Sequence, residues 1–179
     1  VSSSIGFAAF PAHGSDTTSL IRAADLALYH AKGLGRDRGE VFYPELLSRS
    51  KKKTLALLDI ESGLKRGDFH FSYQPIIFRN KTNPISFDAL IRWHHPEHGV
   101  IMPDAFQAGL TDPTISGLIG IYMLDRVFTD IKTMLKMGLS FRRVGVNLTN
   151  ADFRSDRFLE HFFNRCTETG IGPEYFCVE

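Results

Sequence analysis

From about residue 55 onward, segments with helical hydrophobic spacing alternate with segments typical of strands, and this order limits the 179-residue chain to few folds. Leu57, Ile60 and Leu64 recur at helical spacing, and the run 69–75 then alternates apolar and polar residues as a half-buried strand does. A second strand is predicted at 85–93. One helix followed by two strands and further alternating elements is typical of an α/β fold.

The rest of the chain continues this alternation. An Asp-Pro pair opens a segment in which apolar residues recur every four positions from 115 to 135, which predicts a long helix. A strand at 144–149, a helix at 158–166 and a last strand at 175–179 follow. This order predicts a parallel sheet, and such sheets bind ligands at the C-terminal ends of their strands.

The first 44 residues have a separate β-α-β pattern. Strands predicted at 5–10 and 41–43 flank an amphipathic helix at 17–32. The next ten residues are polar, and their three consecutive lysines favour a solvated helix start over a basic recognition patch. The predicted organisation is therefore a segment at 1–44, a linker or helix start at 45–54, and a domain at 55–179.

Charge and composition exclude several classes of partner. Lys and Arg together number 21 and Asp and Glu number 20, so a formal net charge of +1 provides no strong field for nucleic acid or an anionic bilayer. No apolar run reaches the roughly 18 residues that a membrane span requires. Cys166 and Cys177 lie in apolar patterns and indicate reduced thiols. We therefore expect a cytoplasmic protein.

Oxygen-bearing side chains at strand ends are the first candidates for chemistry. Asp88 and Asn147 lie in predicted strands and Glu179 lies at the end of one, and a hard cation such as Mg²⁺ prefers oxygen ligands. Arg92 lies on the same predicted strand face as Leu90 and could bind a phosphate. For Asp88 alone a satisfied structural residue is the alternative, and for Arg92 an ion pair with a nearby acid.

A run of histidines is a weaker candidate. His94, His95 and His98 lie around Pro96 and Gly99, residues typical of a turn, and no cysteine or fourth histidine is close in sequence. We expect a surface loop here and not a metal centre. Neither a glycine-rich dinucleotide motif nor a phosphate-binding loop motif occurs in the chain.

Five ordered segments resemble the first half of an EAL domain, a family that hydrolyses the bacterial messenger cyclic di-GMP. They are YQPI at 73–76, FDALIRWHHP at 87–96, GVIMPDAF at 99–106, GVNLT at 145–149 and PEYFCVE at 173–179. Three upstream segments resemble the end of a GGDEF (diguanylate cyclase) domain: SIGFAAFP at 4–11, ADLALYHAK at 24–32 and GRDR at 35–38. Together these segments indicate part of a tandem GGDEF–EAL protein.

The resemblance implies specific roles and partners. Asp88, Asn147 and Glu179 match the positions that bind Mg²⁺ or Mn²⁺ in the family, Arg92 matches a phosphate-binding arginine, and Gln74 and Leu90 match positions that line the dinucleotide pocket. The implied partner is cyclic di-GMP, and homodimers are common in the family. The implied fold is a GGDEF remnant followed by an incomplete TIM-barrel-type EAL domain.

Three departures from the family bear on activity. Asp88 stands where the signature motif has glutamate, and Mg²⁺ tolerates a retracted ligand poorly. The sequence ends at Glu179, before the family's paired aspartates and lysine, so we assign no catalytic residue and expect this chain to be inactive by itself. The GGDEF motif would lie upstream of Val1. We therefore predict a phosphodiesterase for the whole protein; the alternatives are a degenerate cyclic di-GMP receptor and a scaffold.

Overall fold

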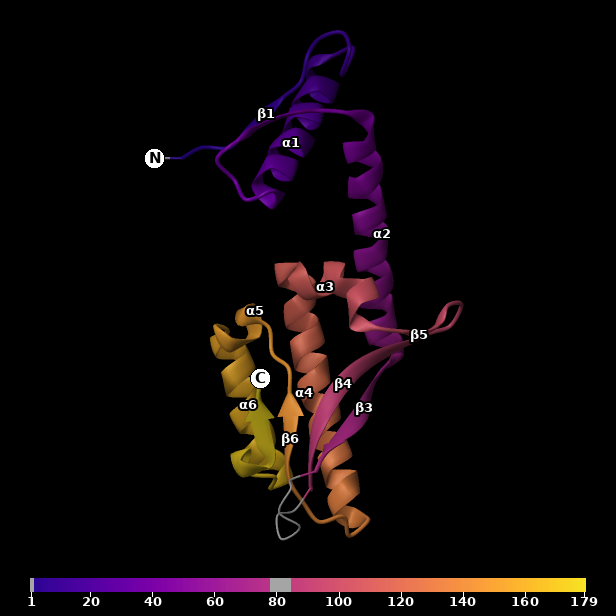
Figure 1. The fold of residues 1–179 in the computed structure, drawn as a ribbon, viewed down its shortest axis with the longest axis vertical. Coiled ribbons are helices and arrows are strands. Elements are labelled where there is room, and N and C mark those ends of the chain that lie inside the picture. The colour runs from indigo at the N-terminus through magenta and orange to yellow at the C-terminus, as the bar shows by residue number, and fades with distance from the viewer. Residues whose placement is uncertain (1, 78–84) are drawn as a thin grey trace. The chain divides into compact units, whose positions relative to one another are not determined.

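The computed structural model describes residues 2–77 and 85–179 and contains two compact units, Val1–Leu55 and Ala56–Glu179. Helix α2, Pro44–Arg66, is continuous and contributes residues to both units (Figure 1). The polar stretch at 45–54 therefore lies inside a helix. Each unit has its own buried residues and is described separately.

The first unit is a β-α-β arrangement. Strands β1, Ile5–Phe7, and β2, Gly39–Val41, pair in parallel, and helix α1, Thr17–Gly33, connects them. The buried side of α1 consists of small residues at helical spacing: Ala23, Ala27 and Ala31. Gly6 of β1 lies against the backbone of α1 at Ala24 and Leu28, where a Cβ atom would collide. Small residues on both elements thus permit the close approach.

The lysine run on α2 is only partly free. Lys53 Nζ donates a hydrogen bond to Tyr29 Oη on α1 at 2.9 Å and also lies over the Tyr29 ring, 5.3 Å from its centroid. Lys51 and Lys52 are exposed. The run is therefore a solvated helix face with one contact inside the first unit.

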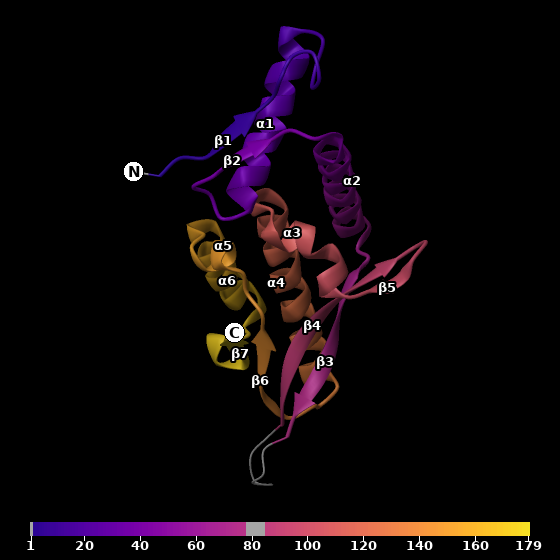
Figure 2. The ribbon, with the colours of Figure 1, turned by 45° about the horizontal axis from the view of Figure 1, so that its top comes forward.

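The second unit is built on a five-stranded sheet. Its strands are β3 (Phe69–Ile76), β4 (Ile85–His95), β5 (Gly99–Ile101), β6 (Phe141–Val146) and β7 (Phe176–Val178). Their order is β3-β4-β6-β7, and β5 forms a hairpin with β4 that is visible in Figures 1 and 2. β6 lies parallel to both β4 and β7, as the α/β pattern predicts.

The pairing of β3 with β4 departs from an all-parallel sheet, because these two strands are antiparallel. Only residues 77–84 connect them. A parallel pair would need a crossover of about a dozen or more residues. The sequence indicates this antiparallel pair, because it predicts two consecutive strands with no helix between them.

Helices cover one face of this sheet and enclose the core. They are α3 (Gln107–Thr111), α4 (Pro113–Lys136), α5 (Asn150–Phe153) and α6 (Asp156–Thr169), with single 3₁₀ turns at Pro103–Phe106 and Pro173–Tyr175. Ala89, Val144 and Val146 pack with Phe128 of α4 and Phe158 of α6 in one cluster. A second cluster joins α2 to the sheet through Ile60, Phe69, Trp93 and their neighbours. The opposite sheet face lacks this helical cover within the described residues.

The start of α4 gives a first prediction. Asp112 Oδ1 accepts hydrogen bonds from the backbone N–H groups of Thr114 and Ile115 at 3.1 and 3.3 Å. Asp112→Ala should lower the free energy of unfolding by about 1 kcal/mol, because it removes this N-cap. Urea titration followed by circular dichroism measures the change. The control is the exposed Asp104→Ala; an equal loss in both variants would contradict the cap assignment.

Two further sequence expectations concern membranes and thiols. In the described part of the chain, no helix is both long and apolar enough to cross a membrane. Cys166 and Cys177 are free and partly buried. Burial raises the pKa of the Cys166 thiol, so this side chain stays protonated and poorly nucleophilic near neutral pH.

Candidate functional site

The register of the strands brings the predicted site residues onto one sheet face. Asp88 of β4 lies opposite Gln74 of β3 and Gly145 of β6. Ala89 and Val144, their neighbours in sequence, point into the helix-covered core. Because side chains alternate along a strand, Asp88 and Gln74 project from the other face. We call this surface the site face.

A second row of site residues lies toward the C-terminal ends of the strands. Asn147 follows β6 directly, and Glu179 follows β7. The backbone N–H of Leu148 donates to the Glu179 carbonyl at 3.1 Å, and the Glu179 N–H donates to the Val146 carbonyl at the same distance. The ladder between the two strands therefore continues past their ends. It fixes the backbone of Asn147 and Glu179 side by side.

Gly145 is the meeting point of two carboxylates. A Cβ atom built on Gly145 would lie 2.5 Å from Asp88 Oδ1 and 3.5 Å from Glu179 Oε1. Asp88 Oδ1 is buried and has no hydrogen-bond partner among the described residues. A buried carboxylate oxygen without a partner is unfavourable unless an ion, a water molecule or a ligand compensates it.

The donor set has the chemistry of a divalent-cation site. Asp88, Asn147 and Glu179 offer two carboxylates and one amide oxygen, all hard ligands. The described residues contain no cluster of three or more His, Cys, Asp or Glu side chains arranged to hold a metal ion. The three predicted residues therefore fit Mg²⁺ or Mn²⁺ in ligand type, but they supply only part of a coordination shell.

Arg92 lies beside a cavity at the same end of the sheet. The cavity has a volume of about 340 Å³ and is lined by Leu90, Arg92, Asn147 and residues of α4. Arg92 Nη1 donates to the carbonyl of Ile91 at 2.8 Å. Since a guanidinium has five N–H donors, this one bond within the described part of the chain leaves Arg92 able to hold an anion at the cavity.

Two titratable groups on β3 have shifted pKa values. Partial burial lowers the pKa of His70, and the positive charge of Arg126 lowers it further. Burial raises the pKa of Tyr73 above its ordinary range, aided by the Asp130 carboxylate, to which its hydroxyl donates at 2.9 Å. Tyr73 therefore remains a neutral structural donor at physiological pH.

The histidine run is only partly the expected surface loop, because His94 and His95 are the last residues of β4 and pair with β5. His95 is 7% exposed, and its Nε2 lies 3.0 Å from Asp59 Oδ2 on α2. Its Nδ1 accepts hydrogen bonds from the backbone N–H groups of Glu97 and His98, both at 3.1 Å. The prediction of a loop was thus wrong for both His94 and His95, and the prediction of exposure was wrong for His95, because the turn closes around its imidazole. His94 and His98 are exposed as expected.

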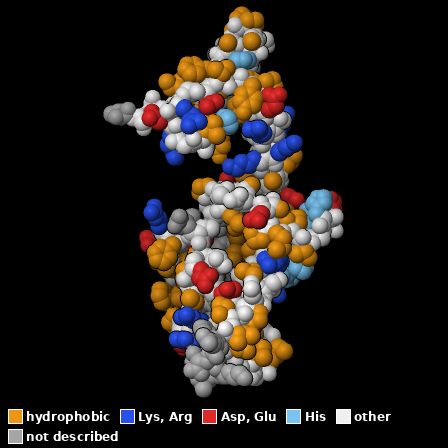
Figure 3. Space-filling view, viewed as in Figure 1, with side chains coloured by type: hydrophobic (Ala, Val, Ile, Leu, Met, Phe, Trp, Pro, Cys, Tyr) orange, Lys and Arg blue, Asp and Glu red, His pale blue; other side chains and the backbone are white. Residues whose placement is uncertain are grey.

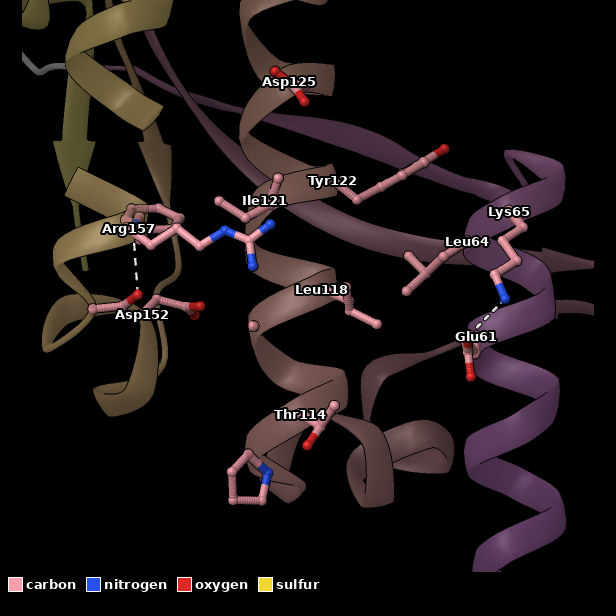
Figure 4. Close-up of a pocket in the computed structure, with 14 residues that line it drawn as sticks. Glu61, Leu64, Lys65, Thr114, Leu118, Ile121, Tyr122, Asp125, Asp152 and Arg157 are labelled. Carbon is pink, nitrogen blue, oxygen red and sulfur yellow. Dashed lines mark hydrogen bonds and ion pairs between the residues drawn. The ribbon is translucent and has the colours of Figure 1, made fainter. Parts of the chain in front are cut away.

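A larger hollow lies on the helical side of the second unit. It has a volume of about 610 Å³ and is bordered by α2, α4 and the segment from α5 to α6 (Figure 4). Its wall combines apolar residues such as Leu118 and Phe158 with the ion pair of Glu61 and Lys65. Asp152 borders both this hollow and the 340 Å³ cavity.

Sequence reasoning missed two residues that shape the site. The sequence contained an indication for Gly145, because a glycine inside a predicted strand often marks the close approach of another group. The indication for Asp152 was weaker: the Thr-x-x-Asp spacing after the predicted strand is typical of a helix cap. The sequence could not show that Gly145 lies under the Asp88 carboxylate or that Asp152 is buried.

Comparison with known families supplies the assignment. The EAL domain model matches residues 58–179, more than half of the chain. The chain belongs to the EAL domain family. The matched residues of this EAL domain include the six predicted site residues and the whole site face.

Two curated relatives extend the comparison. The EAL chain is 29% identical over its full length to the bifunctional diguanylate cyclase/cyclic di-GMP phosphodiesterase MucR of Pseudomonas aeruginosa, covering 26% of that protein. It is 33% identical over 83% of its length to the cyclic di-GMP phosphodiesterase PdeR of Escherichia coli, covering 22% of that protein. The chain therefore spans about a quarter of the length of these relatives.

A solved structure supports the fold of the EAL unit. The PaMucR phosphodiesterase in complex with c-di-GMP matches with a TM-score of 0.63 and 25% identity, over 69% of this chain and 50% of that chain. The EAL unit thus has the α/β fold of its family.

Proposed function

We propose that the protein containing this EAL domain is a metal-dependent phosphodiesterase that opens cyclic di-GMP to the linear dinucleotide. The observation that carries the proposal is the convergence of the Asp88 and Glu179 carboxylates on Gly145, with Asp88 Oδ1 buried and unpaired among the described residues. The similarity to two cyclic di-GMP phosphodiesterases gives the substrate class.

Asp88, Asn147 and Glu179 would hold Mg²⁺ or Mn²⁺ in this proposal. A bound divalent cation activates a water and neutralises charge that develops on the phosphodiester. The residues of this chain bind and orient the substrate: Arg92 holds a phosphate at the cavity, and Gln74 and Leu90 line the dinucleotide site. We assign no catalytic acid or base to the chain.

A second candidate function is a receptor that binds cyclic di-GMP without hydrolysis. Asp88 favours it, because its carboxylate is one methylene shorter than the family's glutamate and Mg²⁺ requires near-ideal octahedral distances of about 2.0–2.1 Å. In that case the Arg92 and Gln74 contacts would remain useful while turnover would be lost.

Calorimetric titration of cyclic di-GMP into the whole protein that contains this EAL domain, in Ca²⁺, followed by product analysis in Mg²⁺ or Mn²⁺, separates the two functions. Binding followed by linear product supports the phosphodiesterase. Binding without product supports the receptor. Absence of binding would contradict both and leave the scaffold.

Arg92 gives a prediction for the binding step. Arg92→Ala should weaken cyclic di-GMP binding in Ca²⁺ by roughly 10- to 100-fold, because a hydrogen bond to a charged group contributes about 1.5–3 kcal/mol. Arg142→Ala is the matched control, since Arg142 is exposed near the opposite end of β6. Equal effects of the two variants would indicate general charge loss and contradict the phosphate contact.

The segment before the EAL match is proposed as the end of a GGDEF domain. The similarity to MucR, whose name includes diguanylate cyclase, extends over the full chain and thus beyond the EAL match at 58–179. In this proposal 1–44 is the GGDEF segment, 45–54 the helix start and 55–179 the EAL segment. A homodimer and a cytoplasmic location stay predictions.

A further inference from the structure

We infer that Asp152 is a positioning residue that fixes Asn147 for metal binding; this rests on the proposed metal site. Asp152 is 3% exposed and lies in α5, at the turn that follows Asn147. Its carboxylate is therefore held away from water, in contrast to the exposed acidic residues on the helix surfaces.

One carboxylate oxygen of Asp152 fixes the turn. Asp152 Oδ2 accepts hydrogen bonds from the backbone N–H of Thr149 at 3.0 Å and from its hydroxyl at 2.6 Å. The Thr149 hydroxyl in turn accepts from the Asp152 N–H at 3.2 Å. This reciprocal capping box holds the backbone two residues after Asn147.

The other oxygen packs against the core. Asp152 Oδ1 occupies the space that a Cβ atom would fill at Gly120 of α4, and Figure 4 shows Asp152 beside that helix. Oδ1 is buried without a hydrogen-bond partner among the described residues. A capping box alone does not require a buried, unpaired oxygen, because the exposed Asp16 forms one with Ser19 at the start of α1.

The position of Asn147 is thus determined from both sides. On one side the backbone bonds between Leu148 and Glu179 attach it to β7. On the other side Asp152 is hydrogen-bonded to the following turn and packs against α4 at Gly120. Residues that orient a metal ligand commonly affect metal affinity about 10- to 100-fold when replaced. We therefore expect Asp152 to affect metal affinity without contacting the ion.

The test measures Mn²⁺ binding to the full chain by the electron paramagnetic resonance signal of free Mn²⁺. Asp152→Asn should raise the Kd for Mn²⁺ by roughly tenfold. Gly120→Ala should have a similar effect with Asp152 intact, because the added methyl group displaces Oδ1. Since alanine is the better helix former, a general loss of helix stability would not explain that result.

Two controls separate positioning from charge and from stability. Asp156→Asn removes the same charge from an exposed site on α6. Ser155→Ala removes the cap hydrogen bond from Phe158 N–H to Ser155 Oγ, 3.3 Å long, and destabilises α6. Both variants should bind Mn²⁺ within twofold of the wild type.

Each outcome decides the inference. Weakened binding in Asp152→Asn and Gly120→Ala with both controls unchanged supports it. Wild-type affinity in Asp152→Asn, or an equal loss in Ser155→Ala, overturns the positioning role and leaves the metal site standing. If the wild-type chain binds no Mn²⁺ at all, the proposed metal site fails and the inference fails with it.

Discussion

Gly145→Ala should weaken Mn²⁺ binding by about 10- to 100-fold, as expected for a residue that orients a metal ligand. The new methyl group would lie 2.5 Å from Asp88 Oδ1, well inside contact distance. The Asp88 carboxylate must then move out of line with Glu179. Overpacking of this kind should also lower the free energy of unfolding by about 1–3 kcal/mol. Titration of Mn²⁺ into both proteins measures the change in affinity.

Gly117→Ala is the matched control for this experiment. Nothing lies within 4 Å of a Cβ atom built on Gly117, which faces open space on α4. Alanine there should leave Mn²⁺ binding unchanged and stabilise the helix slightly. Unaltered Mn²⁺ affinity in Gly145→Ala would show that Asp88 does not take part in binding from its observed position.

Phe128→Ala should lower the free energy of unfolding of the EAL unit by about 3–5 kcal/mol, the range for a buried phenylalanine. Phe128 is fully buried on α4. Its ring lies 4.7 Å from that of Phe176 on β7 and 5.8 Å from that of Phe162 on α6. The truncation thus opens a cavity among three elements at once, and urea unfolding monitored by circular dichroism reports the loss.

Phe163→Ala provides the comparison for Phe128. Phe163 lies on α6 and is 58% exposed, so its removal should change the unfolding free energy by less than about 1 kcal/mol. In Figure 3, hydrophobic side chains (orange) lie among charged ones (blue and red) on the visible face of the EAL unit. Similar losses in both variants would mean that α4 is not the centre of the core.

The sequence predicted long, strongly periodic elements best. The apolar residues at every fourth position from 115 to 135 correspond to α4, Pro113–Lys136, because one helix face is buried from Ile115 to Ile131. The strand predicted at 144–149 is displaced, since β6 spans Phe141–Val146. Thr149 there caps α5 and cannot continue the strand. Local capping chemistry overrode the alternating pattern.

The candidate site could be predicted in composition but not in arrangement. Asp88, Asn147 and Glu179 were identified by type and position in the sequence, and the strand order places them on one face. The role of Gly145 depends on which strands are neighbours, information that no single segment contains. The burial of Asp152 likewise depends on α4, which lies some thirty residues earlier in the sequence.

Asn147 and Glu179 directly follow the neighbouring strands β6 and β7, and Asp88 lies on β4 opposite Gly145, two residues before Asn147. Backbone hydrogen bonds hold neighbouring strands about 4.8 Å apart, so the sheet fixes the Cα positions of all three proposed oxygen donors. A substitution at one of these positions can then change the length of the side chain without disturbing the backbone frame that the sheet provides. An aspartate at position 88 widens the gap that an ion must bridge. The identity of one residue can thus adjust the ionic radius that this frame accepts while leaving the fold unchanged.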